Sequence, residues 1–290
     1  MKERDPRKMA LQIAGMRMNE THLPEDERIF TDPYAEYFFP KAVREMARED
    51  RWAKTEREKY EAVMPGVNGA LAARIRYIDA CLMEAIQSGF KQLVMIGAGY
   101  DTRAYRIPGL EENLRVFEVD HPLTQEVKIR TISEIFGHLP DHVTYVPVVF
   151  GKDSIEQRLF ESGYDSGLKT LFIMEGLLMY LPPAAVDRLL GFICKASKPG
   201  SAVVADYFDA TVVDGTSSLK EAQALKSFVE SEGSLLQFGI PDGSVESFFS
   251  ERGFRQTSCF AASDCKEKYF TGAGLNRAVT PMFKFVHAVV

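Results

Sequence analysis

The stretch that decides the fold is Val94-Met-Ile-Gly97-Ala98-Gly99-Tyr-Asp101-Thr-Arg103. Its first residues are apolar and predict a buried β-strand. The two glycines that follow predict a tight turn whose backbone a ligand can approach closely. A dinucleotide-binding fingerprint would place a third glycine three residues after Gly99, where this chain has Thr102. The turn therefore predicts a ligand site, but not one typical of NAD.

Further apolar runs follow, each short enough to be a strand. They lie at 116–119, 143–149, 171–174 and 202–205, and the segments 122–135 and 182–196 between them have helical spacing. Alternating strands and helices predict an α/β fold with a doubly wound, mostly parallel sheet. In such a sheet, ligands bind at the carboxyl ends of the strands.

The helix that precedes the first strand contributes one candidate side chain. Between Gly69 and Gly89, apolar residues recur at the spacing of one helical face. With about 3.6 residues per turn, Arg74 borders this face, whereas Arg76 points toward water.

Both ends of the chain differ from this pattern. Residues 1–66 carry mixed charges and helical signals, which predict a helical cap. Residues 67–290 would form the ligand-binding domain, with a second cap segment near 207–245. Near the C-terminus, the apolar runs 254–261 and 282–289 predict an antiparallel pair of strands at the sheet edge, with no helix between them.

Composition excludes several classes of protein. Of the 290 residues, 46% are hydrophobic and 26% are charged, as in folded soluble domains. The formal net charge of −6 gives no attraction to nucleic acid or to an anionic membrane, and no apolar run is long enough to span one. Cysteines without CxxC spacing and an N-terminus without a signal peptide predict a cytoplasmic protein. The oligomeric state stays open.

Acidic residues follow two of the other predicted strands. Asp120 ends the second run, where a carboxylate can accept hydrogen bonds from both hydroxyls of a ribose. Glu175 follows the run 171–174 and could hold an ammonium group. Tyr180, five residues further on, could line a substrate site or pack in the core.

Other common catalytic patterns are missing from the sequence. The histidines form neither HxxxH nor HExxH and do not cluster with cysteine, so we expect no catalytic metal. There is no GxSxG elbow of a serine hydrolase and no GxxxxGK[ST] loop of a phosphoryl-transfer enzyme. His121 follows Asp120 directly and could border a ligand there.

Four ordered motifs resemble those of one family. They are Ala73-Arg74-Ile-Arg-Tyr-Ile-Asp79, Gly97-Ala-Gly-Tyr-Asp101-Thr-Arg-Ala-Tyr-Arg106, Phe117-Glu-Val-Asp120-His-Pro122 and Glu175-Gly-Leu-Leu-Met-Tyr180-Leu-Pro182. They are similar to motifs of the leucine carboxyl methyltransferase family of S-adenosyl-L-methionine-dependent methyltransferases, in its bacterial polyketide O-methyltransferase-like branch. The resemblance implies a seven-stranded, mostly parallel, doubly wound sheet with a reversed last strand and a helical N-terminal cap.

The resemblance also implies a role for each motif. Arg74 would pair with the methionine carboxylate of S-adenosyl-L-methionine, Asp120 would hold its ribose, and Glu175 would lie beside its methionine moiety. The partner would be a small-molecule methyl acceptor, with Tyr180 as the candidate catalytic residue. The other implied cofactor-binding positions are Gly97, Ala98, Gly99, Asp101, His121, Val149, Phe150 and Gly176.

One motif departs from the family pattern. Relatives commonly carry Asp-Leu-Arg after the third strand, where this chain has Val149-Phe150-Gly151. Without that arginine, a small or protein-borne carboxylate loses its electrostatic anchor, and apolar contacts would position the acceptor instead. We therefore predict a small, largely hydrophobic or aromatic acceptor with a carboxylate or an acidic hydroxyl, in preference to a protein C-terminus. Asp153 could replace the missing acid beside the adenine. Aromatic cap residues could position the acceptor, namely Tyr34, Tyr37, Phe38 and Phe39.

Two other functions stay open at this point. An NAD(P)-dependent oxidoreductase would also use a glycine turn and a ribose-binding acid, but it would need the third glycine and has no role for Arg74. A non-catalytic protein that binds S-adenosyl ligands is made more credible by the departure at residues 149–151.

Overall fold

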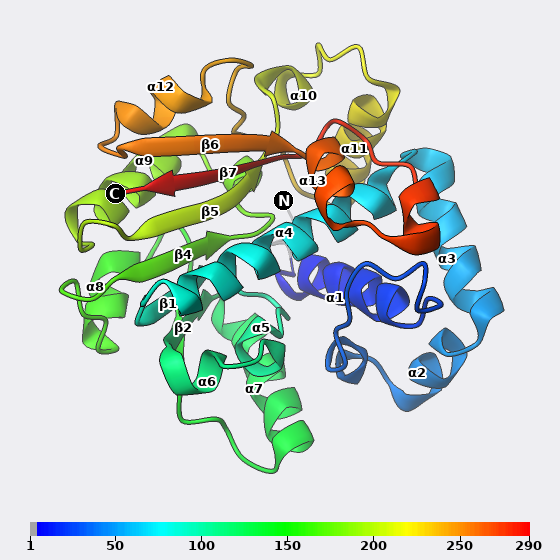
Figure 1. Cartoon of the computed structure of the whole chain (residues 1–290), viewed down its shortest axis with the longest axis horizontal. Helices are drawn as coiled ribbons and strands as arrows, with labels where there is room; N and C mark the ends of the chain where they lie inside the picture. The colour runs from blue at the N-terminus through cyan, green and yellow to red at the C-terminus, as the bar shows by residue number, and fades with distance from the viewer. Residues whose placement is uncertain (1–4) are drawn as a thin grey trace.

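A seven-stranded sheet forms the centre of the molecule (Figure 1). The computed structural model describes residues 5–290, except the side chains of residues 50–53. The strand order is β3-β2-β1-β4-β5-β7-β6, and β7 runs antiparallel to both of its neighbours while the other pairs are parallel. The predicted fold class is confirmed, including the reversed last strand. The strands are β1 (Gln92–Ile96), β2 (Arg115–Asp120), β3 (Val143–Pro147), β4 (Thr170–Met174), β5 (Ala202–Tyr207), β6 (Gln256–Ala261) and β7 (Lys284–Val289).

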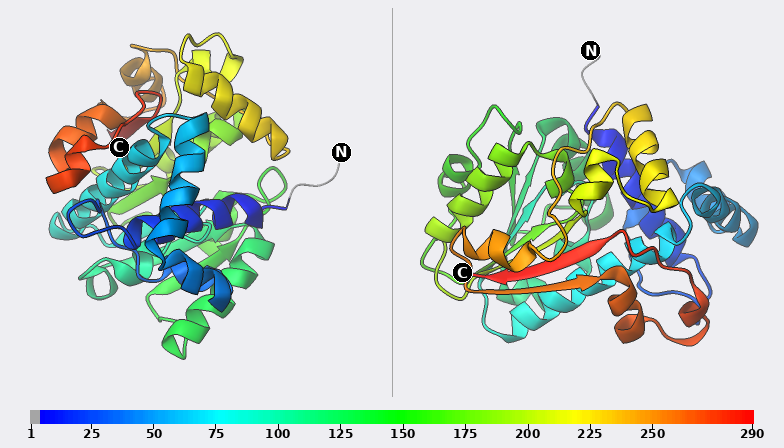
Figure 2. Two further views of the ribbon diagram at one scale, coloured as in Figure 1. Left: turned by 90° about the vertical axis from the view of Figure 1, so that its right-hand side faces the viewer. Right: turned by 90° about the horizontal axis from the view of Figure 1, so that it is seen from above.

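The sheet separates two apolar cores, because alternate side chains of each strand point to opposite faces. In β1, Leu93 and Met95 belong to one core, while Val94 and Ile96 belong to the other. Helices cover both faces, as Figure 2 shows in the view from above. One face packs against α4 (Val67–Gln87), α5 (Arg103–Arg106), α6 (Leu110–Asn113) and α13 (Ala262–Tyr269), and the other against α8 (Ile155–Glu161), α9 (Pro183–Lys195) and α12 (Val245–Ser250).

Local sequence explains where the helix after β2 begins and ends. Helix α7 (Pro122–Phe136) begins with proline, whose fixed φ suits the first helical turn. The side chain of His121 accepts a hydrogen bond from the Leu123 amide and caps this end. The helix ends at Gly137, where φ is +76°. This cap holds the first turn of α7 beside the end of β2.

The remaining helices lie mainly at the end of the sheet to which the parallel strands point (Figure 1). They come from two stretches of the chain, the predicted N-terminal cap and the segment after β5. They are α1 (Arg7–Thr21), the 3₁₀ helix η1 (Ala35–Phe38), α2 (Lys41–Ala47), α3 (Asp50–Val63), α10 (Ala210–Asp214) and α11 (Lys220–Ser231). The 3₁₀ helix η2 (Leu178–Tyr180) follows β4 at the same end. The domain boundaries stay a prediction.

The C-terminal third corrects two expectations, one about its own helices and one about Arg76 of α4. Helix α13 and the 3₁₀ helix η3 (Gly272–Asn276) lie between β6 and β7, where no helix is predicted. The helix is short and buries only Ala262 and Cys265, so its apolar period is too brief to recognise. Because α13 packs on α4, Arg76 lies over the Tyr269 ring, 5.0 Å from its centre, and does not simply point toward water.

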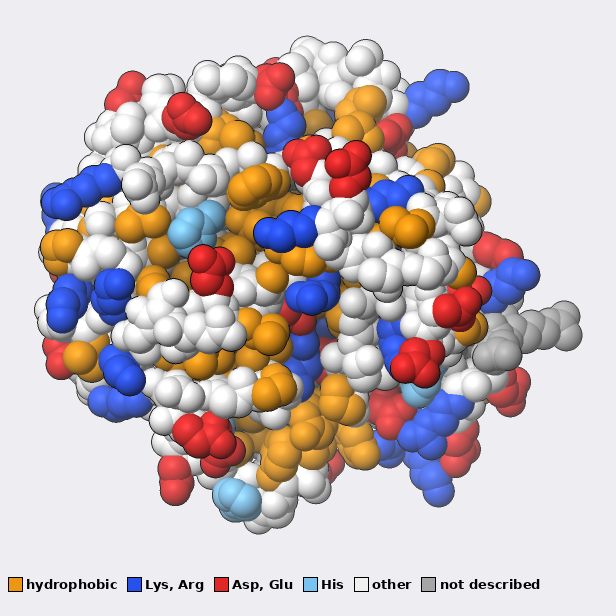
Figure 3. All heavy atoms as spheres, in the orientation of Figure 1, with side chains coloured by type: hydrophobic (Ala, Val, Ile, Leu, Met, Phe, Trp, Pro, Cys, Tyr) orange, Lys and Arg blue, Asp and Glu red, His pale blue; other side chains and the backbone are white. Residues whose placement is uncertain are grey.

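The surface shows no segregation of charge on the face drawn in Figure 3, where acidic and basic side chains are interspersed. Within residues 5–290, no helix combines the length and the apolar character needed to cross a membrane. In the same part of the chain, no three His, Cys, Asp or Glu side chains gather as metal ligands would.

Candidate functional site

A cavity of about 870 Å³ lies at the carboxyl ends of the parallel strands. Its wall includes the turn after β1 and the ends of β2 and β4, together with α1, α4 and α11. The residues predicted to bind the cofactor and the candidate catalytic residue all line this one cavity. These residues are Arg74, Gly97, Ala98, Gly99, Asp101, Asp120, His121, Val149, Phe150, Glu175, Gly176 and Tyr180. Their individual roles stay predictions.

The glycine turn requires its glycines. Gly97 and Gly99 have φ angles of +74° and +50°, in the left-handed region that other residues rarely adopt. A Cβ atom on Gly97 would come within 3.2 Å of the Leu177 side chain. The turn therefore brings bare backbone to the cavity wall.

Asp120 is fixed beside this turn. Its carboxylate oxygens accept hydrogen bonds from the backbone amides of Gly99 and His121, each at 2.5 Å. Burial raises the pKa of Asp120, and the two amides oppose that shift. A carboxylate can accept about four hydrogen bonds, so this fixed group keeps capacity for ligand hydroxyls.

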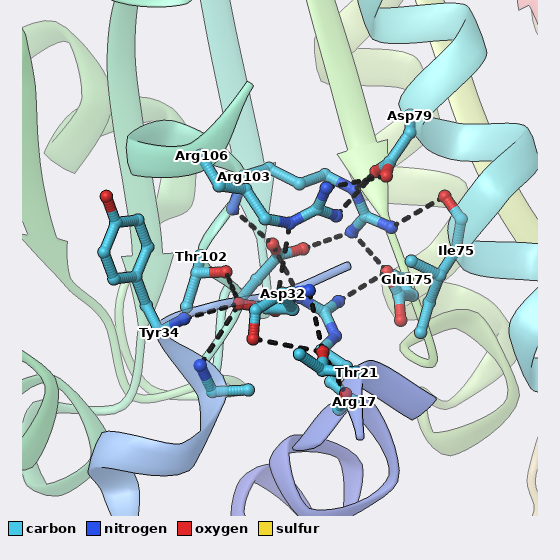
Figure 4. A network of polar contacts seen from close by, with 12 residues as sticks. Arg17, Thr21, Asp32, Tyr34, Ile75, Asp79, Thr102, Arg103, Arg106 and Glu175 are labelled. Carbon is cyan, nitrogen blue, oxygen red and sulfur yellow. Dashed lines mark hydrogen bonds and ion pairs between the residues drawn. The ribbon is translucent and has the colours of Figure 1, made fainter. Parts of the chain in front are cut away.

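Three arginines converge on Glu175 (Figure 4 shows Arg17 and Arg103). Arg17 Nη2 and Arg74 Nη2 each lie 3.0 Å from a different carboxylate oxygen of Glu175, and Arg103 contacts the same oxygen as Arg17. All four side chains are buried. Burial alone would raise the pKa of Glu175, but the guanidinium groups of Arg103, Arg17 and Arg74 outweigh it and lower the pKa to about 2. Glu175 is therefore ionised at neutral pH.

Two more carboxylates fix the arginines that border the cavity. Asp101 accepts hydrogen bonds from Arg17 Nη1 at 2.9 Å and from the Arg103 amide at 2.8 Å. Asp206, at the end of β5, accepts from Arg74 Nη1 at 2.9 Å and from the Gly176 amide at 2.5 Å. Burial raises the pKa of Asp206 and outweighs the opposite effect of Arg74. Arg74 thus has a fixed carboxylate on each side.

An outer layer of the same network ties the N-terminal segment to the sheet (Figure 4). Asp79 accepts from Arg103 Nε at 2.6 Å and from both Nη atoms of Arg106 at 2.7 and 2.8 Å. Asp32 accepts from the Thr102 hydroxyl at 2.6 Å and lies 3.6 Å from Arg17 Nη1. The network therefore connects α1, α4, the turn after β1 and the end of β4.

The hydrogen-bonding groups of Arg74 and Glu175, at the charged end of the cavity, fit an amino-acid moiety. Within the described residues, Arg74 Nε and Nη2 and Glu175 Oε1 have no well-aligned hydrogen bond, although the two side chains form an ion pair. Buried polar atoms without partners are rare in folded proteins. A guanidinium can bind a carboxylate through two nitrogens, and a carboxylate can accept from an ammonium group. Both groups occur at the methionine end of S-adenosyl-L-methionine.

The other end of the cavity is apolar and aromatic. We call it the apolar arm, and its side chains belong to one continuous hydrophobic cluster. It carries no charged side chain. Its residues are Tyr60, Met64, Val67, Leu71, Phe208, Leu225, Phe228, Val229 and Phe283.

The aromatic residues predicted to position the acceptor do not line the cavity, so that prediction is wrong. Tyr34 packs edge-on against Phe136 of α7, with ring centres 5.1 Å apart. Phe38 stacks on Tyr100 at 4.4 Å and so lies behind the cavity wall. Asp32 accepts hydrogen bonds from the amides of residues 34 and 35, and this turn directs the segment toward α7.

The suggested role of Asp153 is also wrong. Its carboxylate accepts a hydrogen bond from the Val149 amide at 2.8 Å and lies 3.6 Å from Arg158. It closes its own loop and does not line the cavity, whereas Val149, Phe150 and Lys152 do.

Sequence reasoning missed Arg17 as a site residue. Arg17 lies one helical turn after Ile13 on α1, and both residues line the cavity. The only sequence signal is weak. Met9, Ile13 and Met16 lie on one apolar face of the helix, and Arg17 continues that face as a charged residue at a buried position.

Known proteins match the chain over most of its length. The leucine carboxyl methyltransferase family matches residues 10–194. A Bacillus subtilis (strain 168) protein named "Putative S-adenosyl-L-methionine-dependent methyltransferase YktD" is 27% identical over 217 residues, which are 75% of this chain and 71% of that protein. A Mycobacterium marinum (strain ATCC BAA-535 / M) protein named "Putative S-adenosyl-L-methionine-dependent methyltransferase" is 40% identical over 145 residues. That match covers 49% of this chain and 47% of the relative, so the chain spans about half the length of that relative.

Solved structures support the fold. A Thermobifida fusca protein described as a methyltransferase superposes with a TM-score of 0.58 at 12% identity, covering 94% of this chain and 93% of the other. A duf574 family protein from Streptomyces avermitilis gives 0.57 at 11% identity, covering 93% and 99%. At such low identity, the likeness concerns the fold alone. The two relatives by sequence are both named as S-adenosyl-L-methionine-dependent methyltransferases, and the glycine turn and the strand-end carboxylates line one cavity. The match to the family model shows that the chain belongs to the leucine carboxyl methyltransferase family.

Proposed function

We propose that this protein transfers a methyl group from S-adenosyl-L-methionine to an oxygen of a small, largely hydrophobic or aromatic molecule. The acceptor oxygen belongs to a carboxylate or an acidic hydroxyl. The observation that carries the proposal is that one cavity joins a buried arginine–carboxylate end to the apolar arm.

The charged end of the cavity suits the donor. Arg74 would bind the methionine carboxylate, Glu175 its ammonium group, and Asp120 the ribose hydroxyls. When bound, the donor supplies a methyl group activated by its sulfonium. The buried network fixes Arg74 and Glu175 before binding, and two backbone amides fix Asp120, so little side-chain entropy is lost when the donor is ordered.

The chain's contribution to the reaction is positioning. Helix α1 and the apolar arm line the space beside the donor end. Holding an acceptor oxygen near the methyl group can lower a barrier by about 7–11 kcal/mol. A carboxylate with a pKa of about 4 is already ionised at neutral pH and needs no general base.

The apolar arm determines the class of acceptor. The other cations on the cavity wall are Arg7, which Asp5 engages at 2.7 Å, and Lys152 on the loop after β3. A peptide C-terminus would leave its polar backbone unpaired against the arm, and buried polar groups without partners are costly. An aromatic or aliphatic body would instead bury apolar surface there.

Transfer of a labelled methyl group tests the proposal. The protein is incubated with methyl-labelled S-adenosyl-L-methionine and panels of aromatic acids, fatty acids, phenols and a folded protein with a free C-terminal carboxylate. We expect label in small apolar acids or acidic hydroxyl compounds. Faster labelling of the protein substrate would contradict the acceptor class. Binding of donor without transfer to any acceptor would favour the non-catalytic alternative.

A further inference from the structure

The order of the strands determines where the adenosine part of a bound donor must lie. The methionine end is placed by Arg74 and Glu175, beside the ends of β4 and β5, and the ribose by Asp120 at the end of β2. Strand β3 is the next strand outward from β2. A donor that runs from Glu175 across the glycine turn to Asp120 therefore carries its base into the space between the first turn of α7 and the loop after β3.

The loop after β3 offers that base no acidic side chain, and besides two apolar residues only the cationic residue Lys152 lines the cavity from this loop. Val149 and Phe150 line the cavity with apolar side chains. The Val149 amide donates to Asp153, and the Val149 carbonyl accepts from the amides of Lys152 and Asp153, each at 3.0 Å. The Val149 and Phe150 side chains can therefore pack against the adenine ring. The backbone amide and carbonyl of Val149 are already hydrogen-bonded within the loop.

The opposite side holds a polar group that the fold leaves without a partner. Thr124, in the first turn of α7, lines the cavity and is 1% exposed. Within the described residues, its Oγ1 has no hydrogen-bond partner. The carbonyl four residues earlier, that of Asp120, already accepts from the Val148 amide at 2.9 Å. A threonine in a helix has two accessible χ1 rotamers, so its hydroxyl can turn toward a ligand in the cavity.

From this position we infer that the Thr124 hydroxyl hydrogen-bonds the adenosine moiety of the donor. The inference rests on the proposed function, because it needs the donor in this cavity. It explains a buried hydroxyl that has no hydrogen-bond partner among the described residues. It also supplies a polar contact to adenosine in a chain whose loop after β3 has apolar side chains in place of an acid.

Titration calorimetry with two ligands tests the inference. S-adenosyl-L-homocysteine contains the whole donor skeleton without the methyl group, and 5′-deoxy-5′-methylthioadenosine lacks the amino-acid end. We expect Thr124→Val to weaken both ligands by the same factor, about three- to tenfold, as for loss of one neutral hydrogen bond. Thr124→Ser, which keeps the hydroxyl, should bind both within about twofold of the wild type.

Two comparisons separate this role from a structural one. Arg74→Ala should weaken S-adenosyl-L-homocysteine but not the methylthioadenosine fragment, because Arg74 meets only the amino-acid end. The melting temperature of Thr124→Val should equal or exceed that of the wild type, since the variant loses an unpaired buried hydroxyl. A lower melting temperature, or unchanged affinity for both ligands, would overturn the inference. Failure of the wild type to bind S-adenosyl-L-homocysteine at all would instead overturn the proposed function.

Discussion

The two ends of the cavity are built in opposite ways. At the charged end, Arg17, Arg74 and Glu175 are buried and each is fixed by partners from other elements. In the apolar arm, side chains such as Leu71 and Phe228 interact through packing within a large hydrophobic cluster. Charged groups with fixed partners define one ligand geometry, whereas apolar contacts tolerate differences in shape. The molecule therefore combines a rigid donor end with an acceptor end that selects for apolar character.

The two ends share helix α4, which carries both Arg74 and Leu71, but otherwise come from different parts of the fold. The charged end is assembled around the ends of β2, β4 and β5, and the apolar arm comes largely from helices α3, α4 and α11. Changes at the charged end should affect binding of the donor, while changes in the arm should affect binding of the acceptor more than that of the donor.

The largest effect is expected from Arg74→Ala. The variant leaves buried Asp206 and Glu175 without one of their cationic partners, which should lower the free energy of unfolding by about 3–5 kcal/mol. Donor binding should weaken by about 1.5–3 kcal/mol through loss of a charge-assisted contact. Urea denaturation and titration calorimetry measure the two effects. Arg76→Ala is the matched control on the same helix, because Arg76 packs on Tyr269 and should cost less than about 1 kcal/mol. Equal losses in both variants would contradict the difference assigned to the two arginines.

Acid should weaken the charged end through Glu175. Its pKa falls from an ordinary value of 4.5 to about 2 in the folded protein. The ionised group therefore stabilises the fold fully above pH 4.5, and this contribution is lost as the pH falls toward 2. Between pH 6 and pH 3 the loss should be on the order of 2 kcal/mol, measured by urea denaturation. Glu175→Gln should remove this part of the pH dependence, and an unchanged slope in that variant would refute the assignment.

A smaller effect is expected in the apolar arm. Phe228→Ala should raise the KM for the acceptor by about tenfold, because an aromatic ring is lost from the packing surface. Affinity for S-adenosyl-L-homocysteine should stay within about twofold, since the Phe228 ring packs in the hydrophobic cluster of the arm. Leu235→Ala serves as the control, because Leu235 is 61% exposed and lies outside the cavity. A parallel loss of donor affinity in Phe228→Ala would show that the two ends are not independent.

The smallest effect is expected at Tyr180, which lines the cavity near the end of β4. With a carboxylate acceptor no base is required, so Tyr180→Phe should change kcat by less than about threefold. General-base catalysis typically contributes about 100-fold or more. A loss of that size, measured in steady-state assays, would favour a weakly acidic hydroxyl acceptor and a catalytic tyrosine.

Much of the charged end could be predicted from sequence because strand ends leave a clear pattern. Short apolar runs end directly before Gly97, Asp120 and Glu175. Because these runs are strands, the three residues lie at the ligand-binding edge of the sheet. Arg74 followed from its position on a helical face. Arg17 was missed because no strand adjoins α1 in the sequence. Its helical face is a weak signal, and its hydrogen bonds to Asp101 and Glu175 show its place in the site.

The apolar arm could not be predicted in the same way. Leu71 and Phe228 have the same residue types and helical spacing as ordinary core residues, so sequence does not reveal that they line a cavity. The aromatic residues between 34 and 39 were misplaced for a related reason. Side-chain directions in an irregular segment follow from its turns, and the hydrogen bonds of Asp32 direct that turn toward α7.

Calorimetric titration of the wild-type protein with S-adenosyl-L-homocysteine and, separately, with NADH tests most directly whether this cavity is a donor site. The buried arginines, Glu175 and Asp120 predict micromolar binding of the adenosyl ligand and no binding of NADH. Heat from NADH, with none from S-adenosyl-L-homocysteine, would contradict the account.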